Sequence, residues 1–156
     1  MLVVLEGCDG AGKTELAKFL SKVLKADIIH CSTHTPNDIT FFNDIIEASK
    51  GKRNVIADRF CYGQFIYQQP DERPLKDNMF TAEENLYALE TLMLANKAKV
   101  IYVTAPADVI KSRLRARGEE LINGLTVEEV LNRYDDVIRK SMLPWIVYNT
   151  GGEGNV

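Results

Sequence analysis

The chain has 156 residues, of which 46% are hydrophobic, and a formal net charge of -3. This length fits one domain with a single hydrophobic core, and the slightly acidic balance argues against a nucleic-acid or membrane-surface binder. Three cysteines are too few for a disulfide framework. No apolar window has the length of a membrane span, and the N-terminal apolar run lacks the features of a signal peptide, so we expect a cytoplasmic protein.

Five short apolar runs predict buried strands, because each run is too short for a helix. These runs are Leu2 to Leu5, Ile28 to Ile29, Asn54 to Ala57, Lys99 to Val103 and Ile146 to Tyr148. Their apolar residues are continuous rather than alternating, which is typical of parallel strands that are covered on both faces.

Helical patterns separate these runs. Apolar residues spaced for one helix face predict helices over Leu16 to Leu24 and over Val127 to Ile138. Two helix starts carry a capping box, Thr81 with Glu84 and Thr126 with Glu129. Strands in alternation with helices predict an α/β fold, a three-layer sandwich around a five-stranded parallel sheet that binds ligands beyond the carboxyl ends of its strands.

The segment "GCDGAGKT", residues 7–14, matches the phosphate-binding P-loop pattern in full. It follows a predicted strand and opens a predicted helix, so backbone N–H groups and the positive helix end converge on a polyphosphate. We expect Lys13 to reach the β and γ phosphates of ATP and the Thr14 hydroxyl to ligate Mg²⁺. The predicted ATP-binding residues are Gly7, Asp9, Gly10, Ala11, Gly12, Lys13 and Thr14.

The triplet after the third predicted strand distinguishes the chain from a GTP-binding switch. Such switches carry D-x-x-G and N-K-x-D after later strands, whereas this chain has Asp58, Arg59 and Phe60 after its third strand. Asp58 is expected to hold Mg²⁺ through water or to orient an acceptor, with a helix N-cap as the alternative. The planar fork of Arg59 suits a phosphate clamp, with an ion pair to an acidic residue as the alternative.

The combination of "LEGCDGAGKT", "VIADRF", "YGQFIYQ" and "IYVTAPADVIKSRLRARG" resembles the thymidylate kinase family of nucleoside monophosphate kinases and, more loosely, the deoxynucleoside kinases. The resemblance extends from Leu2 to about Tyr134. It implies the P-loop nucleotide kinase fold in one domain, residues 1–156, with an acceptor-binding segment at about 33–50 and a lid at about 113–125.

The same resemblance implies the acceptor-binding residues. It puts Asp9 near the sugar of the acceptor nucleotide, Arg59 on its phosphate, Gln64 on its base and Tyr67 beside the deoxyribose, with Gln68 completing a Tyr-Gln pair. It also implies a homodimer formed through helices that flank the sheet. Independently of the resemblance, Phe41 is a candidate to stack on the acceptor base, and packing in the core is the alternative.

The basic run "KSRLRARG" supplies further cations. On a helix Arg113 and Arg117 lie one turn apart on one face, whereas Arg115 points elsewhere, so two guanidinium groups can close over the phosphates as a mobile lid. In the family, glycine at the position of Gly10 goes with a catalytic cation drawn from the lid. The alternative is a solvated basic helix end, because arginine near a helix C-terminus is favourable without any ligand.

Two features depart from the family pattern. Thr33 to Pro36 only faintly echoes the family's Thr-Arg-Glu-Pro, and His34 stands where its arginine is expected, so one phosphate ligand is missing there. The chain also ends soon after the fifth predicted strand, where the family usually continues into a final helix, and Asn149 to Gly152 is a candidate loop beside the adenine of ATP.

These residues together predict ATP-dependent phosphorylation of a deoxynucleoside monophosphate, a pyrimidine such as dTMP or dUMP, to the diphosphate. One alternative is a deoxynucleoside kinase, in which Asp58 serves as general base for a 5′-hydroxyl. Another is a nucleotide-binding regulator without turnover, which the short acceptor segment favours. The predicted catalytic residues are Lys13, Asp58, Arg59, Arg113 and Arg117, and the predicted metal ligands are Thr14 and Asp58.

Overall fold

A computed structural model describes residues 1–31, 39–51, 53–67, 83–121 and 124–151. Five strands form one sheet in the order β2-β3-β1-β4-β5, and every neighbouring pair is parallel. The strands are β1 (Leu2–Glu6), β2 (Asp27–His30), β3 (Val55–Asp58), β4 (Lys99–Thr104) and β5 (Trp145–Asn149). All five predicted strands are confirmed, with ends that differ by one residue at most.

Six helices connect these strands within the described residues. They are α1 (Lys13–Leu24), α2 (Ile39–Ala48), α3 (Gly63–Ile66), α4 (Glu83–Ala95), α5 (Ala107–Arg117) and α6 (Val127–Lys140). The predicted helices over 16–24 and 127–138 are confirmed as parts of α1 and α6. Thr126 caps α6 as predicted, because its hydroxyl accepts a hydrogen bond from the backbone N–H of Glu129 at 3.1 Å. The other predicted capping box lies outside the described residues, since Thr81 and the side chain of Glu84 are not described.

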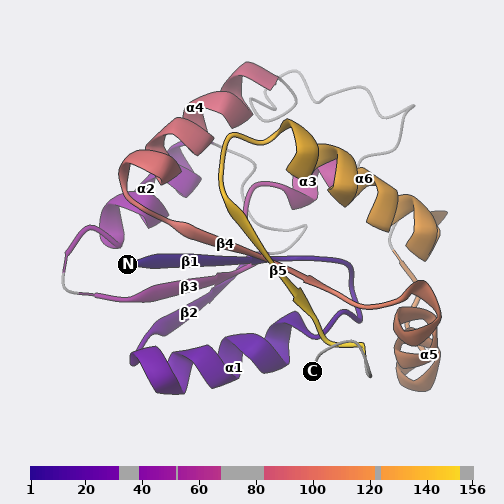
Figure 1. Ribbon diagram of the computed structural model, residues 1–156. Helices are drawn as coiled ribbons and strands as arrows, with labels where there is room; N and C mark the ends of the chain where they lie inside the picture. Colours follow the sequence, from indigo (N-terminus) through magenta and orange to yellow (C-terminus); the bar gives the residue numbers. More distant parts are fainter. Residues whose placement is uncertain (32–38, 52, 68–82, 122–123, 152–156) are drawn as a thin grey trace.

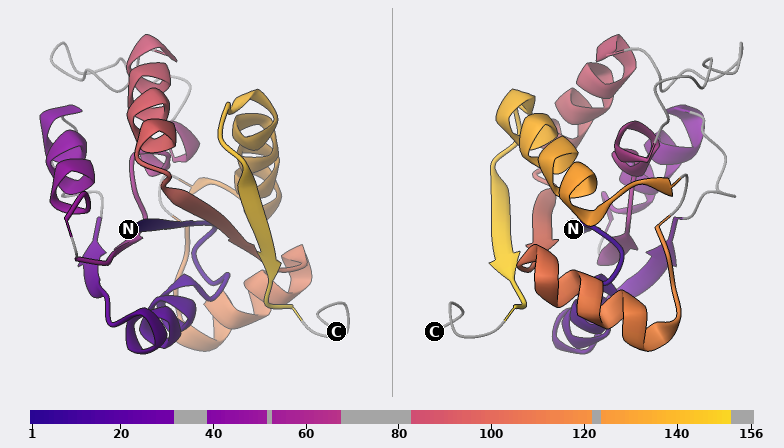
Figure 2. Two further views of the ribbon diagram at one scale, coloured as in Figure 1. Left: turned by 60° about the vertical axis from the view of Figure 1, so that its left-hand side comes forward. Right: turned by 90° about the vertical axis from the view of Figure 1, so that its right-hand side faces the viewer.

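Helices cover the two faces of the sheet in separate layers (Figures 1 and 2). On one face α1 and α5 pack against alternate residues of the central strand, including Val3 and Leu5. On the other face α2 and α4 pack against the intervening residues, Leu2 and Val4. A strand directs successive side chains to opposite faces of the sheet. The buried strand β1 therefore contributes side chains to the cores on both faces. The α/β sandwich that the sequence predicts is confirmed.

The last strand differs from the expectation. We expected the run Ile146 to Tyr148 to be buried, but β5 is an edge strand whose side chains are largely exposed, with Val147 62% exposed. An edge strand has a neighbour on one side only, and among the described residues no helix covers these side chains. Trp145 anchors the start of the strand, because its ring meets that of Tyr62 at 4.8 Å between centroids.

The helices are short in comparison with a bilayer. The longest helix among the described residues, α6, has 14 residues, whereas a membrane-spanning helix needs about 20 apolar residues. Within the described ranges no helix is both long and apolar enough to cross a membrane. The cytoplasmic location stays a prediction.

Candidate functional site

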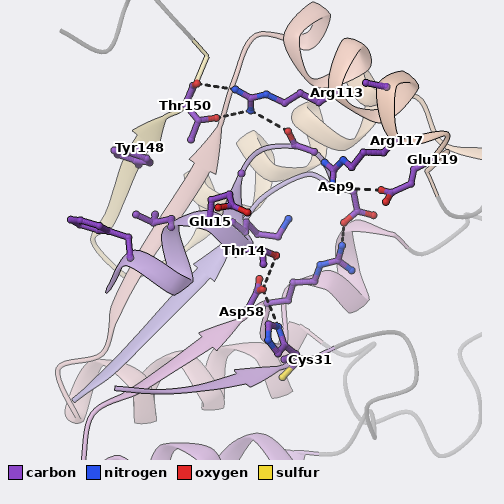
Figure 3. Close-up of a pocket in the computed structure, with 18 residues that line it drawn as sticks. Asp9, Thr14, Glu15, Cys31, Asp58, Arg113, Arg117, Glu119, Tyr148 and Thr150 are labelled. Carbon is purple, nitrogen blue, oxygen red and sulfur yellow. Dashed lines mark hydrogen bonds and ion pairs between the residues drawn. The ribbon is translucent and has the colours of Figure 1, made fainter. Parts of the chain in front are cut away.

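A pocket of about 1150 Å³ opens where the strands end (Figure 3). The P-loop, the ends of β2 and β3, the helix α5 and the segment after β5 all line it. Because β1, β3 and β4 are adjacent and parallel, their carboxyl ends bring chain segments that are far apart in sequence to one place. The pocket is therefore at the position where open α/β sheets bind their ligands.

The P-loop, residues 7–14, joins the central strand β1 to the start of α1. Gly7 passes so close to β4 that a Cβ there would overlap the carbonyl oxygen of Val103. Gly12 directly precedes α1 with φ of 104°, a conformation that favours glycine. The loop thus needs these glycines for its own backbone geometry, and it leaves the N-terminus of α1 open toward the pocket.

The side chain of Lys13 lies under this loop. Its Nζ donates hydrogen bonds to the carbonyl oxygens of Gly7 at 2.7 Å and Cys8 at 2.9 Å. Burial lowers the pKa of Lys13, and the carboxylates of Asp58 and Glu6 oppose this shift. The amine is therefore held at the base of the loop, where a polyphosphate would meet it.

Asp58 connects the P-loop to the edge of the sheet. Its Oδ2 accepts a hydrogen bond from the Thr14 hydroxyl at 3.2 Å and lies 3.1 Å from Nδ1 of His30. Asp58 and His30 are register partners at the ends of β3 and β2, which explains their proximity. Asp58 is buried, with 6% of the residue exposed.

Thr14 and Asp58 together fit a magnesium site. Both offer oxygen ligands, and Mg²⁺ usually takes one or two protein oxygens and completes its octahedron with water and substrate phosphates. The described residues contain no cluster of three or more His, Cys, Asp or Glu side chains suited to a metal. The pair thus suits an ion that arrives with a nucleotide rather than one enclosed by protein.

Asp9 and Arg59, which line the pocket, form one cluster with Tyr67. The guanidinium of Arg59 forms an ion pair with Asp9 and lies 5.7 Å from the ring centre of Tyr67. The backbone N–H of Asp9 donates to the Tyr67 hydroxyl at 3.2 Å. Three residues that were predicted to bind the acceptor thus lie together, and the ion pair given as the alternative for Arg59 is also present.

Glu6, which the sequence analysis did not single out, holds the turn that carries Arg59. Arg59 has φ of 66°, unusual for a residue with a side chain. The next N–H, that of Phe60, donates to Oε1 of Glu6 at 2.9 Å, and the hydroxyl of Tyr134 donates to Oε2 at 2.9 Å. Glu6 is fully buried, and burial raises its pKa. The sequence did contain a sign of this role, because Glu6 is an acidic residue at the end of an apolar strand, directly before the P-loop.

The two predicted lid arginines have different surroundings. Arg113 donates hydrogen bonds to the carbonyl oxygens of Gly10 and Ala11 at 3.2 and 3.3 Å and also contacts Thr150. Arg117 lies at the end of α5, half-exposed, and pairs with Glu119 at 3.8 Å. Both line the pocket, as their shared helix face predicts. Their catalytic role stays a prediction.

Other predicted residues lie partly or wholly outside the described part of the chain. Gln64 lies on α3 and Phe41 on α2, but neither side chain is described. Gln68 and the segment of His34 are not described at all. The neighbouring Phe42 is fully buried.

Comparisons with known proteins agree with this architecture. No protein-family model matches the chain. It is 36% identical over 156 residues to the SPbeta prophage-derived uncharacterized protein YorR of Bacillus subtilis strain 168, and the match covers 96% of this chain and 89% of YorR.

Among solved structures, the crystal structure of Bacillus subtilis YorR in complex with phosphorylated GDP matches with a TM-score of 0.78 at 33% identity, over 96% of this chain and 86% of YorR. Deoxyadenosine kinase from M. mycoides with bound dATP matches with a TM-score of 0.60 at 20% identity, over 96% and 91% of the two chains. A gluconokinase from Sinorhizobium meliloti 1021 reaches 0.54 at 11% identity, over 94% and 81%.

The similarities to the deoxyadenosine kinase and the gluconokinase show the fold alone. Because these two kinases are named for different acceptors, they do not identify an acceptor for this chain. The P-loop nucleotide kinase fold implied by the sequence is confirmed, whereas the resemblance to thymidylate kinases in particular stays a prediction. Identity to YorR above 30% over nearly all of the chain is sufficient to show common descent. The chain therefore belongs to the family of the Bacillus subtilis protein YorR and has the P-loop nucleotide kinase fold.

Proposed function

We propose that this protein transfers the γ-phosphoryl group of Mg·ATP to a deoxynucleoside monophosphate, a pyrimidine such as dTMP or dUMP, and forms the diphosphate. One observation carries the proposal. Asp9 and Arg59, which form an ion pair next to Tyr67, line the same pocket as the rest of the P-loop, so candidate contacts for an acceptor adjoin those for a donor.

The donor half supports phosphoryl transfer by positioning. This reaction needs in-line placement and cations around the transferred group more than covalent chemistry. Lys13 and the N–H groups of the P-loop bind the donor phosphates, and Arg117 faces the same pocket from α5. Thr14 and Asp58 would hold Mg²⁺, which would supply positive charge to the donor phosphates.

The acceptor half supports a phosphate-bearing acceptor. The planar guanidinium of Arg59 can bind two oxygens of one phosphate at once. In the structure its charge is satisfied by Asp9, so an acceptor would exchange this ion pair for a phosphate contact. Tyr67 is buried, with its ring centre 5.7 Å from the guanidinium, and so supports Arg59.

A deoxynucleoside kinase is the second candidate, and the position of Asp58 favours it. This carboxylate is at the end of β3 and already accepts a hydrogen bond from a hydroxyl, that of Thr14. A general base for a 5′-hydroxyl needs such an acceptor within hydrogen-bond reach of the substrate. Arg59 would then bind donor phosphate instead.

YorR widens the range of nucleotides to test, because its structure is described as a complex with phosphorylated GDP. A guanine nucleotide is therefore a reasonable donor or acceptor for this chain as well. The test of function is ADP or GDP release from the magnesium complexes of ATP and GTP, with each deoxynucleoside monophosphate and each parent deoxynucleoside as acceptor.

Turnover with a pyrimidine monophosphate alone supports the proposal and identifies the base. Turnover with nucleosides alone contradicts it and makes Asp58 the general base. Nucleotide binding without turnover contradicts both kinase readings and favours a regulator. The homodimer implied by the resemblance is tested separately by light scattering of the same preparation.

A further inference from the structure

Arg133 is a half-buried cation that the proposed function does not use. It belongs to α6, which lies beside the short helix α3 (Figure 1). Its Nη1 donates a hydrogen bond to the carbonyl oxygen of Ile66 at 2.6 Å. The two residues are 67 positions apart in the chain, so this contact exists only in the folded protein.

The carbonyl group that accepts this bond is the last one of α3, Gly63–Ile66. The last carbonyl groups of a helix have no N–H partner within the helix. Four residues after Ile66 stands Pro70, and because proline has no backbone N–H, a longer α-helix could not supply the missing bond either. The guanidinium of Arg133 therefore makes a contact that the α-helical backbone cannot make, and it holds the point where α3 ends.

Tyr67 follows this point directly and connects it to the pocket. The residue is 6% exposed, and its hydroxyl accepts a hydrogen bond from the backbone N–H of Asp9 at 3.2 Å. Its ring centre lies 5.7 Å from the guanidinium of Arg59. Since a buried tyrosine has few rotamers to choose from, the backbone position at the end of α3 decides where the ring and the hydroxyl lie.

The next residue of α6, Tyr134, supports the same site from its backbone side. Its hydroxyl donates to Oε2 of Glu6, and Oε1 of Glu6 accepts from the backbone N–H of Phe60, the residue directly after Arg59. Consecutive residues of α6 therefore support Arg59 by two routes. Tyr134 acts through the backbone after Arg59, and Arg133 acts through the ring beside its side chain.

We infer that Arg133 is a positioning residue for the acceptor site. It holds the end of α3 and so fixes Tyr67, and Tyr67 in turn keeps the ion pair of Asp9 and Arg59 in place to receive a phosphate. Arg133 needs no contact with either nucleotide for this role. The inference rests on the proposed function, because it takes Arg59 to bind the phosphate of an acceptor monophosphate.

The test measures binding rather than turnover. Calorimetry gives the dissociation constants of the four deoxynucleoside 5′-monophosphates, without ATP, and separately those of Mg·ATP and Mg·GTP. Wild type is compared with Arg133→Met, which keeps an aliphatic stem but has no N–H donor, and with Arg133→Lys, which restores a donor. Arg139→Ala is the matched control, since Arg139 belongs to the same helix, is exposed and pairs with Asp136.

We expect Arg133→Met to weaken binding of the monophosphates about tenfold, as for a residue that acts on a site through its neighbours. Donor affinity should stay within a factor of about two, because the contacts of Arg133 lead to the acceptor side. Arg133→Lys should recover part of the loss, and Arg139→Ala should bind like wild type. Thermal unfolding of each variant verifies that it is folded.

A double-mutant cycle tests the route through Tyr67. Tyr67→Leu removes the ring and the hydroxyl but keeps an apolar side chain in the core. If Arg133 acts through Tyr67, Arg133→Met should weaken monophosphate binding much less in the Tyr67→Leu background than in wild type. Additive effects of the two substitutions would contradict this route.

An unchanged monophosphate affinity in Arg133→Met would overturn the inference. Equal losses of monophosphate and donor affinity would also overturn it, since Arg133 would then have only a general structural role. A wild-type chain that binds no monophosphate would remove the acceptor site and the inference with it. Failure of the proposed function alone looks different: monophosphates bind in an Arg133-dependent manner, but no ADP or GDP is released.

Discussion

Arg113 and Thr150 are joined by two hydrogen bonds, from Nη1 to the hydroxyl and from Nη2 to the carbonyl oxygen, both at 2.9 Å (Figure 3). The Thr150 hydroxyl in turn donates to the carbonyl oxygen of Ala11 at 2.5 Å. Helix α5, the P-loop and the segment after β5 are therefore tied together by one guanidinium. Arg113 supports the P-loop, whereas Arg117, one turn later, pairs with the exposed Glu119.

This difference predicts distinct kinetic effects for the two arginines. Arg113→Ala should raise KM for the nucleotide donor by about tenfold, because charge-assisted hydrogen bonds to the P-loop are lost, and should lower the melting temperature. Arg117→Ala should lower kcat and leave the melting temperature unchanged. Steady-state kinetics with varied donor and thermal unfolding measure both effects.

Arg115→Ala is the matched control, since Arg115 belongs to the same helix but does not line the pocket. It should behave as wild type in both measurements. A drop in kcat with unchanged donor KM in Arg113→Ala would mean that Arg113 acts on the transferred phosphate instead.

Removal of the Lys13 amine should nearly abolish transfer. The loss of one preorganised electrostatic contact commonly reduces kcat by about a hundredfold to a thousandfold, and Lys13→Ala should reach at least this range. Lys13→Met removes the charge and keeps most of the volume, so a similar loss there assigns the effect to charge rather than to packing. Rates near wild type in Lys13→Met would contradict the assignment.

Arg59→Ala should affect the acceptor more than the donor. The guanidinium is expected on the acceptor phosphate, so the acceptor KM should rise by about tenfold to a hundredfold while the donor KM stays within a factor of about two. Arg59→Lys keeps the charge without the planar fork and should recover only part of the loss. A larger shift in donor KM would favour the deoxynucleoside kinase reading.

The buried carboxyl of Glu6 predicts a pH dependence of stability. Its folded-state pKa is raised above the ordinary value of 4.5 because burial disfavours the charged form. As pH rises through 4.5 the unfolded chain releases this proton while the folded chain still holds it, so the free energy of unfolding falls until the folded-state pKa is passed.

Glu6→Gln removes this proton release. Its free energy of unfolding in urea should therefore decline less than that of wild type between pH 4.5 and 8, a range that starts at the ordinary Glu6 value. Glutamine keeps an oxygen for the Phe60 N–H, and Tyr134 can still donate to the carbonyl oxygen of Gly7 at 3.3 Å. If the free energy of unfolding of both proteins changed with pH in parallel, Glu6 would not take up a proton on folding.

Local patterns in the sequence were sufficient for the elements and for the donor half of the site. The spacing of apolar residues predicted the ends of the strands and of the two best-defined helices to within a few residues. It could do so because the number of buried faces of an element determines the spacing of its apolar residues. The glycines, Lys13 and Thr14 are adjacent in the chain, so their joint role could be predicted from eight consecutive residues. Arg113 and Arg117 share a face for the same local reason.

Contacts between distant residues were decided only by the tertiary structure. The sequence contains no sign that β2 lies beside β3, which brings His30 to Asp58, or that Thr150 returns to the P-loop. The buried role of Glu6 likewise depends on Phe60 and Tyr134, at separations of 54 and 128 residues. Strand order follows from how helices pack across the whole sheet, and no short window of sequence contains that information. Thus the sequence by itself predicted a phosphate-binding loop, and the fold determined which side chains surround it.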